Sequence, residues 1–159
     1  MNRIFWIDAI YIVLLGTLFG AVMTLGALTA PVIFRASVYM DTAIDLYQSG
    51  KLMSEIFRRF NYALIAALIV ITAYECWQWR IKRCNAGFLI AALTAVISGG
   101  VFAFYCTPFI LAAARSEDIE VLSSPSFHAV HSLSEALFKV FAFALLTLFA
   151  LNLRRLAKP

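Results

Sequence analysis

Four ionisable residues recur at helical spacing in an otherwise apolar segment near the C-terminus. They are His128, His131, Glu135 and Lys139, within the run FHAVHSLSEALFK of residues 127–139. Steps of three and four residues keep side chains on one face of a helix. Two imidazoles at this spacing can share a metal ion if another ligand comes from elsewhere, and an acid four residues before a base favours an ion pair. The pattern therefore predicts a polar site.

Three kinds of ligand chemistry fit these residues, and one structural interpretation fits as well. His128 and His131 could bind copper or zinc, or one of them could be an axial ligand of haem. Further ligands would come from residues expected at the same depth: Glu55, Tyr105 and Cys106. The set could also relay protons or another solute. In the structural alternative, the histidines form hydrogen bonds at the membrane surface, and Glu135 with Lys139 stabilises helix packing.

The composition predicts an integral membrane protein. Of the 159 residues, 63% are hydrophobic and 14% are charged, and the mean hydropathy is +0.87. A soluble domain is about half apolar and about a quarter charged. One membrane domain over residues 1–159 is the economical interpretation. The net charge of +4 lies at helix ends, and no basic run with interleaved aromatics suggests nucleic-acid binding.

Four apolar segments are long enough to cross the lipid bilayer as helices. They cover about residues 4–30, 52–79, 86–113 and 125–153. Proline lacks the backbone donor that a helix interior needs, so Pro31 and Pro108 should end or kink the first and third helices. Ser124 should cap the fourth helix. The predicted fold class is all-α, an integral membrane four-helix bundle.

The polar loop between the first two helices predicts an additional short helix at the membrane surface. Asp41 or Thr42 could cap its start, and Ser49-Gly50 could end it.

Basic residues are more frequent on the side of the two termini than on the opposite side, and the positive-inside rule gives little weight to acids. We therefore expect both termini to lie in the cytoplasm and the His128 end of the fourth helix to lie outside it. The expected location of the protein is the inner membrane of a bacterium.

Charges at membrane depth should face a bundle interior, because an ammonium group in lipid costs a few kcal/mol. We expect His131, Glu135 and Lys139 to face the first two helices. Residues nearer to lipid would be Val130, Leu137 and Phe141. Glu75, near the end of the second helix, should pair with a base of the next loop, with a buried functional carboxylate as the alternative. The candidate bases are Arg80, Lys82 and Arg83.

Small residues predict close contacts between helices. Gly16 and Gly20 form a small-x-x-x-small motif, which fits packing inside the bundle, a homo-oligomer or docking in a larger membrane complex. A second stripe of small residues follows the third helix: Ala91, Ala95, Gly99 and Ala103.

Motifs of soluble enzyme chemistry are absent from the sequence. It contains no GxSxG, HExxH, P-loop or dinucleotide-binding fingerprint, so an enzymatic role would depend on the polar stripe alone. The three cysteines form no CxxC pair and indicate neither a disulfide framework nor a structural zinc site.

Three segments carry a resemblance to a known family. They are GAVMTLGALTAPVIF at residues 20–34, GKLMSEIFRRFNY at 50–62 and FHAVHSLSEA at 127–136. In the last, Phe127, His131, Leu133 and Ser134 match a Phe-x-x-x-His-x-Leu-Ser pattern. The chain thus resembles the membrane family called domain of unknown function 4149, to which the eukaryotic transmembrane protein 205 is similar.

The resemblance implies a small four-helix membrane protein without an assigned reaction. It also implies a distant likeness to copper-resistance membrane proteins and to a haem-binding porphyrinogen oxidase family, which favours metal or haem chemistry. Glu135 and Lys139 lie outside the family pattern, so any role of theirs would be particular to this chain.

Overall fold

The computed structural model describes residues 3–39, 45–116 and 119–157 as a succession of helices. In chain order they are α1 (Arg3–Met23), the π-helix η1 (Thr24–Thr29), α2 (Ala30–Phe34), α3 (Ala36–Tyr39), α4 (Leu46–Arg80), α5 (Ala86–Val101), the π-helix η2 (Phe102–Cys106), α6 (Thr107–Ser116), α7 (Ile119–Leu122) and α8 (Pro125–Leu156). The described residues contain no strand, which confirms the all-α prediction.

Four continuous helical runs have the length and apolar composition needed to cross a membrane. They are Ile4–Phe34, Tyr47–Arg80, Ala86–Ser116 and Pro125–Leu156. The first, third and fourth runs end three or four residues after their predicted ends, and the second begins five residues before its predicted start. We therefore describe the protein as an integral membrane four-helix bundle.

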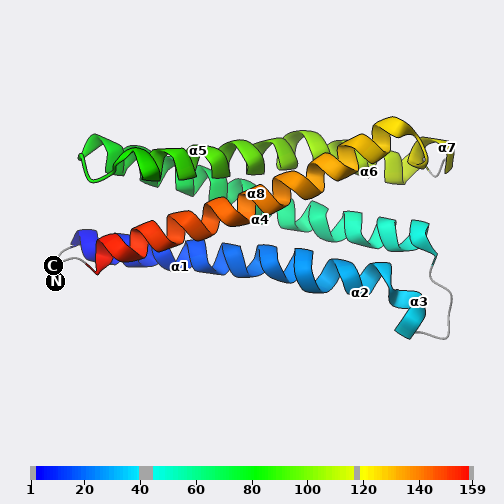
Figure 1. The fold of residues 1–159 in the computed structure, drawn as a ribbon, viewed down its shortest axis with the longest axis horizontal. Coiled ribbons are helices and arrows are strands. Elements are labelled where there is room, and N and C mark those ends of the chain that lie inside the picture. Colours follow the sequence, from blue (N-terminus) through cyan, green and yellow to red (C-terminus); the bar gives the residue numbers. More distant parts are fainter. Residues whose placement is uncertain (1–2, 40–44, 117–118, 158–159) are drawn as a thin grey trace.

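The runs alternate in direction, so both ends of the chain lie at the same end of the bundle (Figure 1). We call this the terminal end; it also contains the turn between α4 and α5. The opposite, far end contains α3 and α7. The last helix, α8, crosses the bundle and packs against both α1 and α5, while α4 packs against α5 and α6.

Helix α4 begins earlier than its polarity suggests. Asp45 caps it, accepting a bond from the Gln48 amide at 2.7 Å while the Gln48 side chain accepts one from the Asp45 amide, which forms a capping box. The helix continues through Ser49 and Gly50, so the predicted stop at these residues is wrong. Ser49 is buried and donates a hydrogen bond to the carbonyl of Ile33.

A one-turn helix does lie in the first loop, but as α3, before the predicted position. Asp41 and Thr42, the predicted caps of that surface helix, lie outside the described residues. The predicted cap of the fourth helix is confirmed, since the Ser124 side chain accepts a bond from the amide of Phe127.

Both intramembrane prolines are accommodated by a wide helical turn. The π-helices η1 and η2 end two residues before Pro31 and Pro108, respectively. A proline ring collides with the carbonyl one turn earlier, and a wider turn moves that carbonyl away. The hydroxyls of Thr29 and Thr107 each donate to a carbonyl five residues back. The helix consequently continues through Pro31 instead of ending there.

Gly16 and the stripe of small residues on the third helical run serve packing inside the bundle, whereas Gly20 does not. A Cβ atom added at Gly99 would come within 2.9 Å of Leu68 and 3.1 Å of Phe141, and one at Gly16 within 3.3 Å of Phe149. The stripe with Gly99 is buried, which confirms the predicted close helix contact. Gly20 is exposed, and a Cβ there would meet no atom within 4 Å.

Candidate functional site

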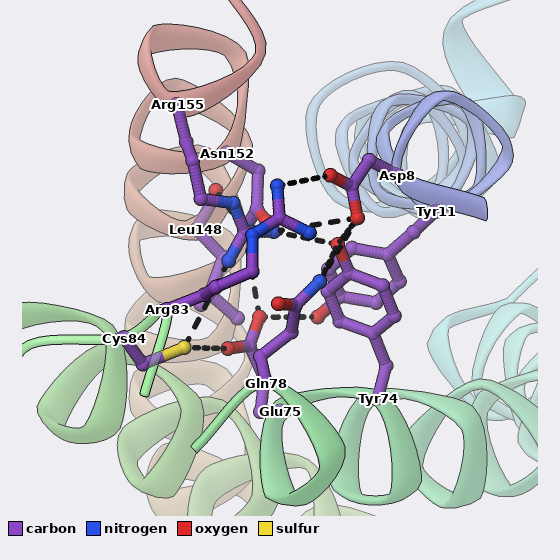
Figure 2. A network of polar contacts seen from close by, with 10 residues as sticks. All are labelled: Asp8, Tyr11, Tyr74, Glu75, Gln78, Arg83, Cys84, Leu148, Asn152 and Arg155. Atoms are coloured by element: carbon purple, nitrogen blue, oxygen red, sulfur yellow. Dashed lines mark hydrogen bonds and ion pairs between the residues drawn. The ribbon is translucent and has the colours of Figure 1, made fainter. Parts of the chain in front are cut away.

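A cluster of polar side chains is buried near the terminal end, where α1, α4, α8 and the α4–α5 turn meet (Figure 2). We call it the terminal polar network; its members are Asp8, Tyr11, Tyr74, Glu75, Gln78, Arg83, Cys84, Asn152 and Arg155. Asp8 is 2% exposed and Glu75 is 7% exposed, and both lie within predicted membrane-crossing runs. Asp8 and Glu75 are the two buried carboxylates among the described residues.

Two tyrosines join α1 and α4 reciprocally. Tyr11 of α1 donates a hydrogen bond to Glu75 of α4 at 2.9 Å, and Tyr74 of α4 donates one to Asp8 of α1 at 2.7 Å. The two phenol rings stack with centroids 3.6 Å apart. Asp8 and Tyr11 are three residues apart and share one face of α1, so a single helix contact places both bonds.

Arginines neutralise Asp8 from two directions. Arg83 Nη2 lies 2.9 Å from Asp8 Oδ2, and Arg155 Nη2 lies 4.0 Å from Asp8 Oδ1. Lys82 has a positive φ of 58°, and the turn closes through a bond from the Arg83 amide to the Gln78 carbonyl. This left-handed residue reverses the chain at the end of α4 and so brings Arg83 back over the helix.

Glu75 is held by neutral donors, so the predicted pairing with a base of the loop is wrong. Besides Tyr11, Asn152 lies 3.4 Å and the Cys84 thiol 3.5 Å from its carboxylate oxygens. Of the candidate bases, Arg83 pairs with Asp8 instead. Burial, followed by the nearby Glu75 charge, raises the pKa of the Cys84 thiol to about 11. Cys84 is therefore a protonated donor near neutral pH.

The terminal polar network balances its formal charges but leaves some buried atoms without partners. It contains two carboxylates and two guanidinium groups. Gln78 Oε1, Arg83 Nη1 and Arg155 Nε are buried without a hydrogen-bond partner among the described residues. Buried polar atoms are nearly always paired in stable structures. The arrangement can therefore accommodate another polar group or a second pattern of bonds.

The stripe predicted from the sequence is assembled, but it lies on the outside of the bundle. His131 Nε2 is 3.4 Å and Lys139 Nζ is 3.8 Å from the two carboxylate oxygens of Glu135. Their side chains are 42%, 72% and 57% exposed, respectively. The prediction that they face the interior is therefore wrong. Val130 and Phe141, expected nearer to lipid, are buried, because large apolar side chains of α8 fill the core.

The residues proposed to complete a metal site are not brought together. His128 and Tyr105 are exposed and Cys106 is fully buried, whereas Glu55 binds the Arg58 and Arg59 side chains at 2.7 and 2.9 Å. In the described ranges, no three side chains of His, Cys, Asp or Glu are grouped in a way that could hold a metal ion. The copper, zinc and haem hypotheses stay predictions.

A lateral groove of about 290 Å³ lies between α4 and α6. Its polar lining consists of Arg58, Asn61, Tyr62, Thr107 and Arg115, and its apolar lining of Ile65, Pro108, Leu111 and Ala112. The amide nitrogen of Asn61 donates to the carbonyl of Ala103, while its Oδ1 is buried without a partner among the described residues. Donor groups at one part and apolar walls at another suit an anionic molecule with an apolar body.

Sequence reasoning missed most of the terminal polar network. Glu75 fits the predicted alternative of a buried carboxylate, but no sequence pattern assigns a role to Asp8 or Asn152. One local signal was available, since Asp8 interrupts an apolar helix and stands three residues before Tyr11. The partners could not be inferred locally, because 64 residues separate Tyr11 from Glu75.

Comparison with known proteins identifies the chain at the level of a family. No curated protein and no solved structure matches it, so the likeness to transmembrane protein 205 and to copper-resistance proteins stays a prediction. A family model, Domain of unknown function (DUF4149), matches residues 13–118, which include Tyr74, Glu75 and Arg83. Because this match covers more than half of the chain, the protein belongs to the DUF4149 family.

Proposed function

We propose that the protein is a proton-linked membrane carrier and that the terminal polar network is a gate at one end of its bundle. The observation that most directly supports this proposal is the burial of two carboxylates, Asp8 and Glu75, inside the bundle. Ionisable side chains inside a membrane bundle are costly and often mark proton or ion pathways. Both carboxylates bond across the same contact between α1 and α4, so a proton on either one alters that contact.

The gate would work through the loss of a counter-charge. As a carboxylate, Asp8 accepts bonds from Tyr74 and Gln78 and neutralises Arg83. A proton on Asp8 would leave the guanidinium without its partner, and breaking a buried pair costs roughly 3–5 kcal/mol. A full shift of a two-state equilibrium from 1:99 to 99:1 takes about 5.5 kcal/mol, whereas a change of about 3 kcal/mol shifts it about a hundredfold, which is enough to open a gate whose closed state is only slightly favoured.

Distance measurements between spin labels on α1 and α4 test the gate. One pair of labels would replace Ile4 and Trp79, which are exposed at the terminal end; a control pair at the far end would replace Val32 and Leu52. We expect the terminal distance to lengthen at acidic pH, and Asp8→Asn to lengthen it at neutral pH. The far-end distance should stay constant. An identical terminal distance under all these conditions would refute the gate.

The groove between α4 and α6 favours a second, separable function, the binding of an anionic amphiphile. The charge near this groove is positive in excess. Glu55 can neutralise only one of its two partners, Arg58 and Arg59, and Arg115 adds a further positive charge to the lining. Guanidinium groups bind sulfonate, carboxylate or phosphate through paired hydrogen bonds. Such a molecule could place its head among these donors and its apolar body along Ile65 and Leu111.

Calorimetric titration with octanesulfonate tests the groove, with octanol as the uncharged control. Arg58→Gln with Arg115→Gln should weaken sulfonate binding at least about tenfold, the equivalent of 1.4 kcal/mol. Glu55→Gln should strengthen binding, because it removes a competing carboxylate. Asp8→Asn should not change the affinity. Uptake of octanesulfonate into vesicles under a pH gradient would show that the molecule bound in the groove is also transported. Binding without uptake would refute the proposed carrier function and would support a binding protein instead.

The remaining sequence hypotheses keep separate tests. Elemental analysis and a visible spectrum of gently purified protein decide whether copper, zinc or haem is bound. Stoichiometric co-purification of another protein would favour the accessory-subunit alternative.

For the orientation in the membrane we propose that both termini are cytoplasmic, on the basis of the positive-inside rule. An impermeant thiol reagent added to intact cells should then label a cysteine placed at Ser116 and not Cys84; the reverse pattern would invert the topology.

A further inference from the structure

The exposed stripe on α8 lies close to the lipid headgroups at the far end of the bundle. Helix α8 has 32 residues and is therefore about 48 Å long, against about 30 Å for the hydrocarbon core of a bilayer. Centred on the bilayer, it extends about 9 Å beyond the core on either side, so the core begins near His131 at the far end. Glu135 and Lys139 then lie about 6 Å and 12 Å inside the core. Both charges need polar partners at this depth.

The side chains of the stripe lean toward the far surface. Helical side chains point toward the N-terminus of their helix, and α8 begins at the far end (Figure 1). The Lys139 ammonium lies 3.8 Å from a carboxylate oxygen of Glu135, which is one turn nearer to that surface. A lysine stem can lie along apolar surface while its head reaches polar groups. The polar groups nearest to both charges outside the protein are the headgroups of the leaflet at the far end.

Glu135 and Lys139 can each bind an outside partner, because their pairing within α8 is loose. The distance of 3.8 Å between Lys139 Nζ and Glu135 exceeds the usual range of hydrogen bonds from nitrogen to oxygen, about 2.7–3.2 Å. Both side chains are also exposed. Glu55 of α4 differs, since hydrogen bonds of 2.7, 2.7 and 2.9 Å from Arg58 and Arg59 occupy its oxygens.

The order of groups along the stripe matches a zwitterionic phospholipid. In such a lipid the ammonium group is attached on the water side of the phosphate, and the acyl chains lie deepest. From the far surface inward, α8 presents the acid Glu135, the base Lys139 and then the exposed apolar side chains of Phe143 and Leu146 on the same face. Each part of the lipid thus meets a side chain of complementary character. Lysine pairs with phosphate, and a primary ammonium donates hydrogen bonds to a carboxylate.

We infer that α8 carries a binding site for phosphatidylethanolamine, a phospholipid with a primary ammonium group, in the leaflet at the far end. The phosphate binds Lys139, the ammonium binds Glu135, and an acyl chain lies along Phe143 and Leu146. The methylated ammonium of phosphatidylcholine has no hydrogen to donate to Glu135, so that lipid binds less well. The site does not depend on the proposed carrier function or on the groove between α4 and α6.

Tryptophan fluorescence reports which lipid lies beside the stripe, because brominated acyl chains quench a nearby indole. In a background with Trp6, Trp77 and Trp79 changed to Phe, Phe143→Trp is the reporter and Ile69→Trp, on α4, is the matched control; the original side chains are 72% and 65% exposed. The vesicles contain phosphatidylethanolamine, phosphatidylcholine and phosphatidylglycerol in equal parts, and one lipid at a time is brominated. At position 143, phosphatidylethanolamine should be enriched over phosphatidylcholine at least about twofold, because exposed ion pairs are individually weak but two act together. At position 69 the three lipids should quench equally.

Two variants separate the order of the charges from their presence. Glu135→Lys with Lys139→Glu retains the net charge and a pair within α8 but reverses the order, so the enrichment of phosphatidylethanolamine should disappear. Glu135→Gln should make phosphatidylglycerol the enriched lipid, because Lys139 alone attracts a headgroup of net negative charge.

The reporters on the intact stripe decide the question even where a stripe variant fails to fold. Equal quenching by phosphatidylethanolamine and phosphatidylcholine at position 143, or the same enrichment at position 69, would overturn the proposal. Enrichment of phosphatidylglycerol beside the intact stripe would also overturn it, as would enrichment that persists after the two charges are exchanged. Quenching by all lipids that is far weaker at position 143 than at position 69 would show that protein covers the stripe, and would overturn it as well.

Discussion

The ion pair between Asp8 and Arg83 should dominate the stability of the terminal end. The Asp8 side chain is 3% exposed and accepts bonds from Tyr74 and Gln78 as well as Arg83. Removing one partner of a buried pair costs roughly 3–5 kcal/mol. Arg83 is 34% exposed and can be rehydrated in part, which places the expected loss for Asp8→Asn at the lower end, about 3 kcal/mol.

A double-mutant cycle separates this pair from general loss of packing. The free energy of unfolding would be measured in mixed detergent micelles for Asp8→Asn, Arg83→Gln and the double variant. We expect the double variant to lose much less than the sum of the two single losses, because neither charge is then left alone. Strictly additive losses would show that the pair is not coupled and would remove the physical basis of the proposed gate.

Three further changes probe packing, the thiol and the exposed stripe. Gly99→Ala should lower the unfolding free energy by about 1–3 kcal/mol through overpacking, whereas Gly100→Ala, whose Cβ would meet no atom within 4 Å, should be neutral or stabilising; equal melting temperatures would contradict the close contact. The pKa of the Cys84 thiol, about 11, should fall in Glu75→Gln, because a nearby negative charge is lost; maleimide labelling at pH 8 should then be several-fold faster, and an unchanged rate would refute the contact. Glu135→Gln should cost at most about 1 kcal/mol within a monomer, since the residue is exposed; a loss of 3 kcal/mol in monomeric protein would show that it is buried.

Local features of the sequence were enough to predict the four spans and several of their ends. Apolar runs of sufficient length identify spanning helices because the backbone must satisfy its own hydrogen bonds in lipid. Two hydrogen bonds show the difference between local and tertiary information. The cap at Ser124 joins residues three apart in the sequence, whereas the bond of Ser49 to Ile33 joins two different helices. Ser49 resembled a helix boundary because it is polar, but it lies inside α4 because its hydroxyl bonds to another helix.

The rotation of each helix about its axis was decided only by tertiary packing. Residues 131, 135 and 139 share one face of α8, as their spacing predicted, but Phe138, Phe141 and Leu145 occupy the interior face. Spacing determines which side chains are neighbours, whereas the shapes of all four helices determine which face is covered. The same reason explains the terminal polar network: Asp8 and Glu75 each stand alone in the sequence, and the packing of α1 against α4 brings a tyrosine from the other helix to each carboxylate.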